Sequence, residues 1–226
     1  ITNTDQRSKY DSYENYEFYI INRYDRLNGL TDKRQISIIL TNANTVILFI
    51  EGKDEEYSIQ PIIEQIKKDK GRIRERDTGY TSYALIDAIM DTYFIILEEI
   101  DSEMEMLDER ISNEQSTSMV KDLFNIKRET LQIKKNTWPL REMINSMQRD
   151  ENSLLFKDVR NIVFIKDLQD HVYNITEMSD NMRDRAYSLV EMHTNFVGMR
   201  MNEIMKVLTI ITTIFVPIMF LASIYE

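Results

Sequence analysis

The pattern of apolar and charged residues divides this chain of 226 residues into two very different parts. Residues 207–225 contain no charged side chain, whereas charged residues are frequent everywhere before them. As a helix, this run would be about 28 Å long, which is close to the hydrocarbon thickness of a bilayer. A buried core helix is the alternative, but its uncharged run is usually shorter. We therefore predict a membrane span that contains Pro217, since membrane helix bundles tolerate proline.

The residues around this run predict its orientation. Arg200 and Lys206 precede it, and the positive-inside tendency then leaves the charged part of the chain in the cytoplasm. Residues 1–10 are polar and charged, unlike a signal peptide. The chain begins without Met and ends one residue after the run, so we expect a fragment that lacks segments at both ends.

A heptad stripe of apolar residues predicts a long helix over residues 83–111. The stripe consists of Ile86, Met90, Tyr93, Leu97, Ile100, Met104, Leu107 and Ile111. Its other face carries seven acids, namely Glu98, Glu99, Asp101, Glu103, Glu105, Asp108 and Glu109. Such a face is usually just solvated, and the alternative is a surface that attracts cations. After a polar turn at 112–118, residues 119–148 predict a second, antiparallel helix with an irregularity at Trp138-Pro139.

Residues 157–225 show no strong helix stop and predict one helix roughly 100 Å long. The apolar positions at three- and four-residue steps are Ile165, Leu168, Val172, Ile175, Met182, Ala186, Leu189 and Phe196, with Ser179 and His193 as polar interruptions. A helix of this length needs partners along its course, either from its own chain or from symmetry-related copies.

Three segments before the helices read as strands, at 16–23, 35–40 and 45–49, and residues 41–44 give a hairpin signal between the last two. The predicted fold class is therefore an α+β cytosolic domain with a partial α/β sheet, mainly α overall. We divide the chain into a partial α/β domain at 1–57, cytosolic helices at 58–156, a stalk helix at 157–206 and a transmembrane helix at 207–225.

Composition excludes several classes of function. The chain has no Cys, so disulfide scaffolds, thiol enzymes and thiolate metal sites are excluded. Its net charge of −10 argues against a nucleic-acid partner. Its five Gly are scattered and form no phosphate loop, and its two His have no triad context. Asp170-His171 is typical of a surface pair. We predict that the protein is not an enzyme.

One face of the last helix is a candidate pore wall. The positions on it are Asn202, Met205, Leu208, Thr212, Val216, Met219 and Ser223. The pattern alone slightly favours a seam for helix packing over the wall of a pore. A pore with amide and hydroxyl oxygens would suit Mg²⁺, which gives up its water reluctantly, and bulky apolar side chains could close it by dewetting.

Four ordered motifs resemble the CorA magnesium transporters over nearly the whole chain. The run MNEIMKVLTIITTIFVPIMFLASIY at 201–225 resembles the first transmembrane helix of that family. YALIDAIMDTY at 83–93 and WPLRE at 138–142 resemble its cytosolic hairpin, whereas DLQDH at 167–171 and residues 177–184 resemble its stalk helix. After the Ile-Tyr that ends this run, the family continues with Gly-Met-Asn, but here Glu226 follows and the chain stops.

The resemblance implies a homopentamer in the cell membrane, contacting membrane lipid, in which each full chain spans the membrane twice and places its N-terminal domain in the cytoplasm. It implies passive divalent-cation transport without ATP and without nucleic acid. Mg²⁺ is the expected ion, with Co²⁺, Ni²⁺ or Zn²⁺ as alternatives. Two other interpretations are kept as alternatives. One is a related zinc or cobalt transporter, and the other is a tail-anchored coiled-coil scaffold without transport.

The resemblance also assigns roles to residues. The pore-lining positions are Asn202, Met205, Leu208, Thr212, Val216 and Met219, with Met205 and Leu208 as the hydrophobic gate. Asp167 and Asp87 match the aspartates that hold regulatory Mg²⁺ between cytosolic domains. Loss of that Mg²⁺ would let the subunits tilt and open the pore, because closely spaced carboxylates need a cation.

Overall fold

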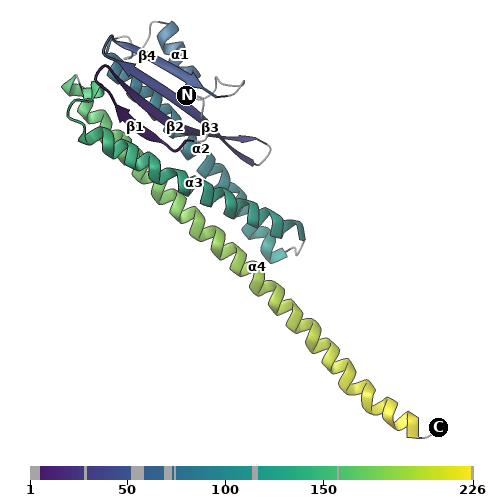
Figure 1. The fold of residues 1–226 in the computed structure, drawn as a ribbon. Helices are drawn as coiled ribbons and strands as arrows, with labels where there is room; N and C mark the ends of the chain where they lie inside the picture. The colour runs from purple at the N-terminus through teal and green to yellow at the C-terminus, as the bar shows by residue number, and fades with distance from the viewer. Residues whose placement is uncertain are drawn as a thin grey trace.

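A computed structural model describes residues 6–27, 30–51, 59–68, 73, 75–113, 117–156 and 158–224. It has a head, made of a sheet and several helices, from which one very long helix projects (Figure 1). The middle of the predicted turn at 112–118 and the last residue of the predicted span, Tyr225, lie outside the described residues.

The sheet is an antiparallel meander in the order β1-β2-β3-β4. Its strands are β1 Lys9–Ser12, β2 Tyr16–Leu27, β3 Leu30–Thr41 and β4 Thr45–Ile50. The predicted hairpin between β3 and β4 is confirmed, with Thr41 paired to Thr45. Asn44 takes the left-handed conformation that this turn requires, with φ of 55°.

The sheet is larger than the sequence pattern predicts. β1 escapes notice because it is short and polar, and β2 and β3 extend through the charged stretch at 24–34. That stretch pairs residue by residue between the two strands, from Tyr24 with Lys33 to Leu27 with Leu30. Charged side chains of this stretch form ion pairs, as Arg26 does with Glu103 and Arg34 with Asp25, so apolar alternation alone marks only part of each strand.

In the part of the chain that the structure describes, four α-helices follow the sheet: α1 Gln60–Lys67, α2 Thr78–Asn113, α3 Thr117–Arg149 and α4 Ile162–Ile224. The predicted antiparallel hairpin is confirmed as α2 and α3, and α3 stays helical through Pro139. The last helix begins later than the predicted residue 157, because two 3₁₀ turns, η1 Leu154–Phe156 and η2 Val159–Asn161, precede it. The 63 residues of α4 correspond to about 95 Å.

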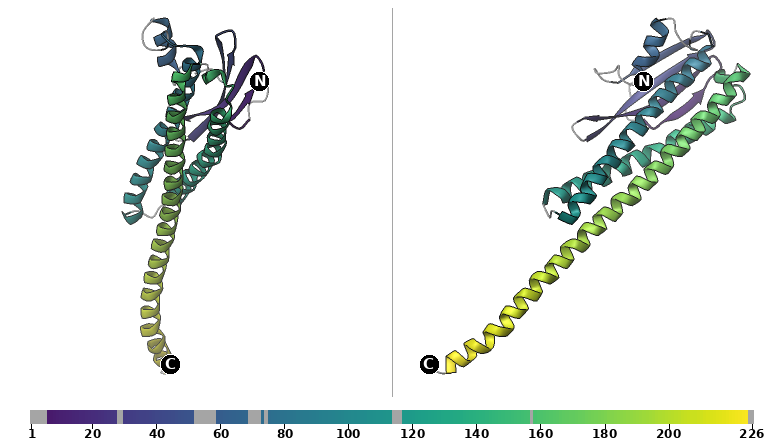
Figure 2. Two further views of the ribbon diagram at one scale, coloured as in Figure 1. Left: turned by 90° about the vertical axis from the view of Figure 1, so that its left-hand side faces the viewer. Right: turned by 180° about the vertical axis from the view of Figure 1, so that it is seen from behind.

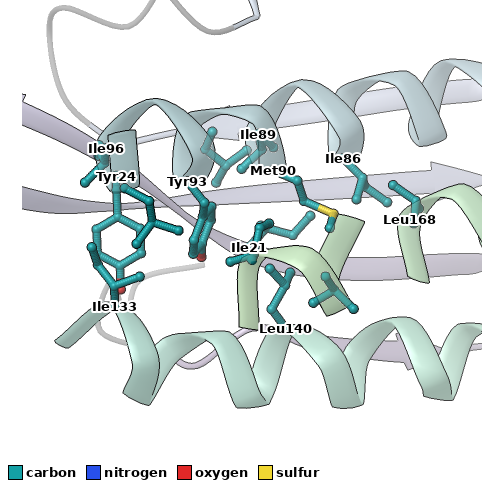
Figure 3. Packing of buried hydrophobic residues seen from close by; sticks show 14 of the residues in the cluster. Ile21, Tyr24, Ile86, Ile89, Met90, Tyr93, Ile96, Ile133, Leu140 and Leu168 are labelled. Carbon is teal, nitrogen blue, oxygen red and sulfur yellow. The ribbon is translucent and has the colours of Figure 1, made fainter. Parts of the chain in front are cut away.

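The core lies between the sheet, the two hairpin helices and the first half of α4. All eight residues of the predicted α2 stripe are buried. Figure 3 shows Ile86 and Met90 of α2 beside Leu168 of α4, with Leu140 of α3 below them. The Tyr93 hydroxyl on the same stripe donates to the Asn22 carbonyl of β2 at 2.7 Å and so joins helix to sheet.

The two halves of α4 differ completely in burial. In the first half, the predicted positions Ile165, Leu168, Val172 and Ile175 are buried, and the buried Ser179 hydroxyl bonds to its own helix. From Val197 to the last described residue, Ile224, every side chain is exposed. This half contains a segment long and apolar enough to cross a membrane, with none of it buried against the rest of the chain.

Candidate metal site and exposed helix face

Asp87 of α2 and Asp167 of α4 lie close together although 80 positions separate them in the sequence. Each directly adjoins a buried apolar residue, Ile86 and Leu168 respectively. When these two apolar stripes pack against each other, the neighbouring carboxylates meet at the rim of the contact. One carboxylate oxygen from each aspartate and one ring nitrogen of His171 all lie within 4.8 Å of one another.

Tyr83 fixes the orientation of Asp167. Its hydroxyl donates to Asp167 Oδ2 at 2.5 Å, and its ring stacks on Phe164 with 4.6 Å between centroids. Burial, followed by the hydrogen bond to Asp167 and the nearby charges, raises the pKa of Tyr83 well above its ordinary value. The tyrosine therefore stays a neutral donor, and Asp167 is the acceptor.

His171 faces Asp87. Its Nδ1 atom is 2.9 Å from Asp87 Oδ1, and its ring meets the Phe94 ring edge-on. Both atoms are enclosed, and neither completes a hydrogen bond within the described part of the chain. A neutral imidazole nitrogen without its proton and a carboxylate oxygen repel each other, so this pair requires a proton or a cation.

The surroundings of Asp87 favour the neutral form of its carboxyl group, because they raise its pKa. Burial is the largest cause that raises the pKa of this carboxyl, and the nearby carboxylates of Asp91 and Asp167 raise it further. His171 acts in the opposite direction. Two carboxylates and an imidazole are a donor set that suits a divalent metal ion, and the enclosed atoms without partners fit such an ion.

The interpretation of Asp170-His171 as a surface pair is wrong. Asp170 is exposed, whereas His171 is half-buried and turns toward Asp87. The sequence does contain a signal for this, because His171 stands four residues after Asp167 and so lies on the same helix face one turn later. That spacing becomes informative only once Asp87 is known to face it.

The acidic face of α2 is partly neutralised within the chain. Arg26 of β2 approaches Glu103 at 2.6 Å, Glu129 of α3 at 3.4 Å and Glu99 at 3.9 Å. Arg185 of α4 pairs with Asp101. The acids that the sequence predicts as one solvated face, with a cation-attracting surface as the alternative, therefore divide into internally paired and exposed groups.

The six predicted pore positions all lie on the exposed half of α4. Met205 and Leu208, the predicted gate, are each more than half exposed, as are Val216 and Met219. The Thr212 hydroxyl donates to the Leu208 carbonyl at 2.8 Å, so in a single chain it satisfies its own helix. Burial within one chain does not separate these positions from the other faces of the same segment.

Comparison with known proteins gives consistent matches. The family model described as "CorA-like Mg2+ transporter protein" matches residues 1–225. The "Cobalt/magnesium transport protein CorA" of Thermotoga maritima is 36% identical over 227 residues, which cover 100% of this chain and 63% of that protein. The "Putative metal ion transporter YfjQ" of Bacillus subtilis is 24% identical over 97% of this chain and 66% of its own length. The chain thus spans less than two thirds of these relatives.

Solved structures share the fold. The structure titled "The complete structure of CorA magnesium transporter from Methanocaldococcus jannaschii" matches with a TM-score of 0.84 at 20% identity, covering 99% of this chain and 69% of that one. The full-length CmaX protein matches with a TM-score of 0.81 at 17% identity, covering 96% and 65%. At these identities the likeness establishes the arrangement of the sheet, the hairpin and the long helix.

Proposed function

Because the chain belongs to the family of CorA-like Mg²⁺ transporter proteins, we propose that the protein of which it is part carries Mg²⁺ passively across the cell membrane. The observation that carries this proposal is the continuity of α4. One helix holds Asp167 and His171 beside Asp87 and continues into the apolar exposed segment. A cation that binds at one end of a rigid helix would affect the pore that the other end of the helix lines. The proposal needs neither catalysis nor ATP.

The ion path would run between several copies of α4, with five copies as the proposed number. Asn202, Met205, Leu208, Thr212, Val216 and Met219 would face the axis. Met205 and Leu208 would form a narrow apolar ring that excludes water when closed. The amide of Asn202 and the hydroxyl of Thr212 would contact the hydration shell of an ion that keeps its water. The remaining faces of this segment would contact lipid.

Regulation would come from Mg²⁺ at Asp87, Asp167 and His171. The ion would neutralise the two carboxylates and hold α2 against the start of α4. Mg²⁺ prefers six ligands, so water or a neighbouring copy would complete its shell. Loss of the ion would leave the two carboxylates repelling each other, which favours separation of the two helices and opening of the pore.

Co²⁺ is the first alternative ion, because the Thermotoga relative is named for cobalt as well as magnesium. Ni²⁺ and Zn²⁺ would suit the imidazole at the site better than Mg²⁺ does. Uptake of each ion into proteoliposomes, measured with the full-length protein, would rank them. A scaffold without transport would give no uptake of any of the four.

Limited proteolysis tests the sensor site. We expect Mg²⁺ to protect the cytosolic part of the full-length protein, and the double variant Asp87→Asn/Asp167→Asn to need at least about tenfold more Mg²⁺ for half protection, which corresponds to ~1.4 kcal/mol. Asp170→Asn is the matched control, since Asp170 is exposed on the adjacent turn. Equal protection of all three proteins would reject the sensor role.

A further inference from the structure

Four polar contacts between the α2 and α4 segments have the same separation in the sequence. Each joins two residues that are 84 positions apart, and the pairs are Asp77 with Asn161, Tyr83 with Asp167, Asp87 with His171, and Asp101 with Arg185. Figure 2 shows α2, in blue to teal, and α4, in green to yellow, starting at the same end of the head. Because both helices rise by about 1.5 Å per residue, a constant separation means that they run parallel in one register. The candidate metal site lies at the second and third pairs.

The first pair fixes the starts of the two helices to each other. Asn161 is fully buried, and its Nδ2 atom donates to Asp77 Oδ1 at 3.0 Å and to the Leu155 carbonyl at 2.9 Å. Asp77 Oδ1 also accepts from the Tyr80 backbone N–H at 3.0 Å and so caps α2. A Cβ atom at Gly79 would lie 2.9 Å from both Asn161 Nδ2 and the Leu155 carbonyl oxygen, so the close approach requires glycine.

The fourth pair is an ion pair that water can reach. The side chains of Arg185 and Asp101 are 34% and 36% exposed, and the guanidinium of Arg185 donates to Asp101 Oδ1. Along α4, Arg185 lies about 36 Å from Asn161. A partly exposed ion pair contributes little free energy and can break and form again. The contact between α2 and α4 is therefore firm at its start and weak at its far end.

The second half of α2 also has space beside it. A hollow of about 760 Å³ separates it from α3. Glu103 and Leu107 of α2 line one side of the hollow, and Ile126 and Glu129 of α3 line the other. Packed protein interiors resist movement because they contain few voids. At this level, α2 can move toward α3 into open space, which changes its distance from α4.

We propose that α2 and α4 pivot relative to each other about Asn161, and that the Arg185–Asp101 ion pair holds them in the closed arrangement together with the bound cation. This inference rests on the proposed function and concerns the regulation of the same metal site. Arg185 and Asp101 are positioning residues, since they act on the ion only through the angle between the two helices.

A pivot at the start of α4 makes a displacement grow along the helix. Asp167 lies about 9 Å from Asn161 along the helix, whereas Leu208 lies about 70 Å from it. In a rigid helix, an opening of about 1 Å at the metal site therefore corresponds to about 8 Å at Leu208. A small change at the ion would in this way be sufficient to move the proposed gate.

The ion pair should set the Mg²⁺ concentration at which the closed arrangement forms. A ligand binds with lower apparent affinity when its binding-competent state is less populated. Arg185→Gln should therefore raise the Mg²⁺ concentration for half protection of the full-length protein in limited proteolysis by about two- to fivefold. Arg183→Gln is the matched control, because Arg183 pairs with Asp180 and Asp184 of its own helix and should leave this concentration unchanged.

Exchange of the two charges separates the ion pair from a general effect on folding. Asp101→Arg alone should shift the Mg²⁺ concentration at least as far as Arg185→Gln, because two guanidinium groups would face each other. Asp101→Arg/Arg185→Asp forms the pair again in the opposite orientation and should restore the natural concentration within about twofold. A double variant that stays as far from the natural protein as Asp101→Arg would overturn the inference.

Cross-linking tests the same contact without relying on charge, because the chain has no Cys of its own. With any cysteine elsewhere removed, Asp101→Cys/Arg185→Cys should need more Mg²⁺ for protection than the natural protein. After reaction with a short bismaleimide, the same protein should be protected without Mg²⁺. A cross-linked protein that is still cleaved without Mg²⁺ would overturn the inference.

The natural protein distinguishes this inference from the proposed function. If Mg²⁺ protects it but Arg185→Gln causes no shift, or no larger shift than Arg183→Gln, the role of the ion pair is overturned and the metal site stands. If Mg²⁺ does not protect the natural protein at all, the regulatory site and the pivot are both overturned.

Discussion

The two halves of α4 have the same backbone conformation and opposite surroundings. Between Ile162 and about residue 196, apolar side chains form one stripe that α2 and α3 cover, and polar side chains face outward. From Val197 onward, all faces are exposed, and after Lys206 all faces are uncharged. A helix that is apolar on every side needs lipid or other helices around it. The first half is thus completed by its own chain, and the second half is not.

Because of this difference, substitutions in the two halves of α4 should have different effects. In the first half, a change in an apolar residue alters the packing of a closed core and should affect folding. In the second half, if the proposed function holds, the same change would alter contacts with lipid or with other copies and should affect transport. Asp87, Asp167 and His171 lie on the first half and its partner α2, so in the proposed transporter an ion bound to them would act on the second half through α4.

The largest effect is expected from a charge at the proposed gate. Leu208→Asp would hydrate the narrow apolar ring and should give a continuous leak of ions in proteoliposomes. Ile210→Asp is the matched control, since it lies about 200° around the helix from Leu208. We expect it to face lipid, cost about 3 kcal/mol of insertion free energy and lower the amount of protein in the membrane without a leak.

Ion flux per inserted molecule distinguishes the two variants. A leak from both variants would show that the segment is disrupted in general, and a leak from neither would remove Leu208 from the pore wall. Either result would contradict the proposed orientation of the second half of α4, with Leu208 toward the pore and Ile210 toward lipid. The packing of the first half would be unaffected.

An intermediate effect is expected from truncating the core of the first half. Ile175 is fully buried, so Ile175→Ala should lower the free energy of unfolding by about 2–5 kcal/mol. Ile211→Ala, at a position 48% exposed in the chain, should change it by less than about 1 kcal/mol. Denaturant titration in detergent, followed by circular dichroism, measures both. Equal losses would mean that the second half also packs in a closed core.

Sequence patterns predicted the elements better than their contacts. The stripe from Ile86 to Ile111 identified α2 because a regular apolar period survives any tertiary arrangement. Strand β1 was missed because four polar residues carry no period. Most informative is His171, whose partner Asp87 lies on another helix. The packing of the whole head decides which helix faces contact one another. The spacing of residues along a single helix does not predict those contacts.

The pairing of Asp87 with Asp167 illustrates the same limit. Periodicity placed each aspartate beside an apolar stripe, and only the resemblance to a known family joined them. Arg26 is a further case, since its contacts with Glu103 and Glu129 depend on the β2–β3 hairpin reaching across both arms of the helical hairpin. Residues 24–34 are not part of the predicted strands, so the sequence pattern does not bring Arg26 to the acids of α2.

The smallest effect concerns pH, and it should arise at Asp87, on the helix α2 that packs against the first half of α4. Burial raises the pKa of Asp87 above its ordinary value of 3.8. An acid whose pKa is higher in the folded state binds more protons there than in the unfolded state, so without metal it destabilises the fold as pH rises.

Asp87→Asn removes this effect and should be more stable than the natural protein in metal-free buffer at neutral pH, by less than about 1 kcal/mol because the carboxyl is partly open to water. The difference should disappear as pH falls below 3.8. Saturating Mg²⁺ should reverse the order, since only the natural protein keeps both carboxylates for the ion. Thermal unfolding at several pH values measures this, and a natural protein more stable than the variant in metal-free neutral buffer would show that Asp87 already has its counter-charge within the chain.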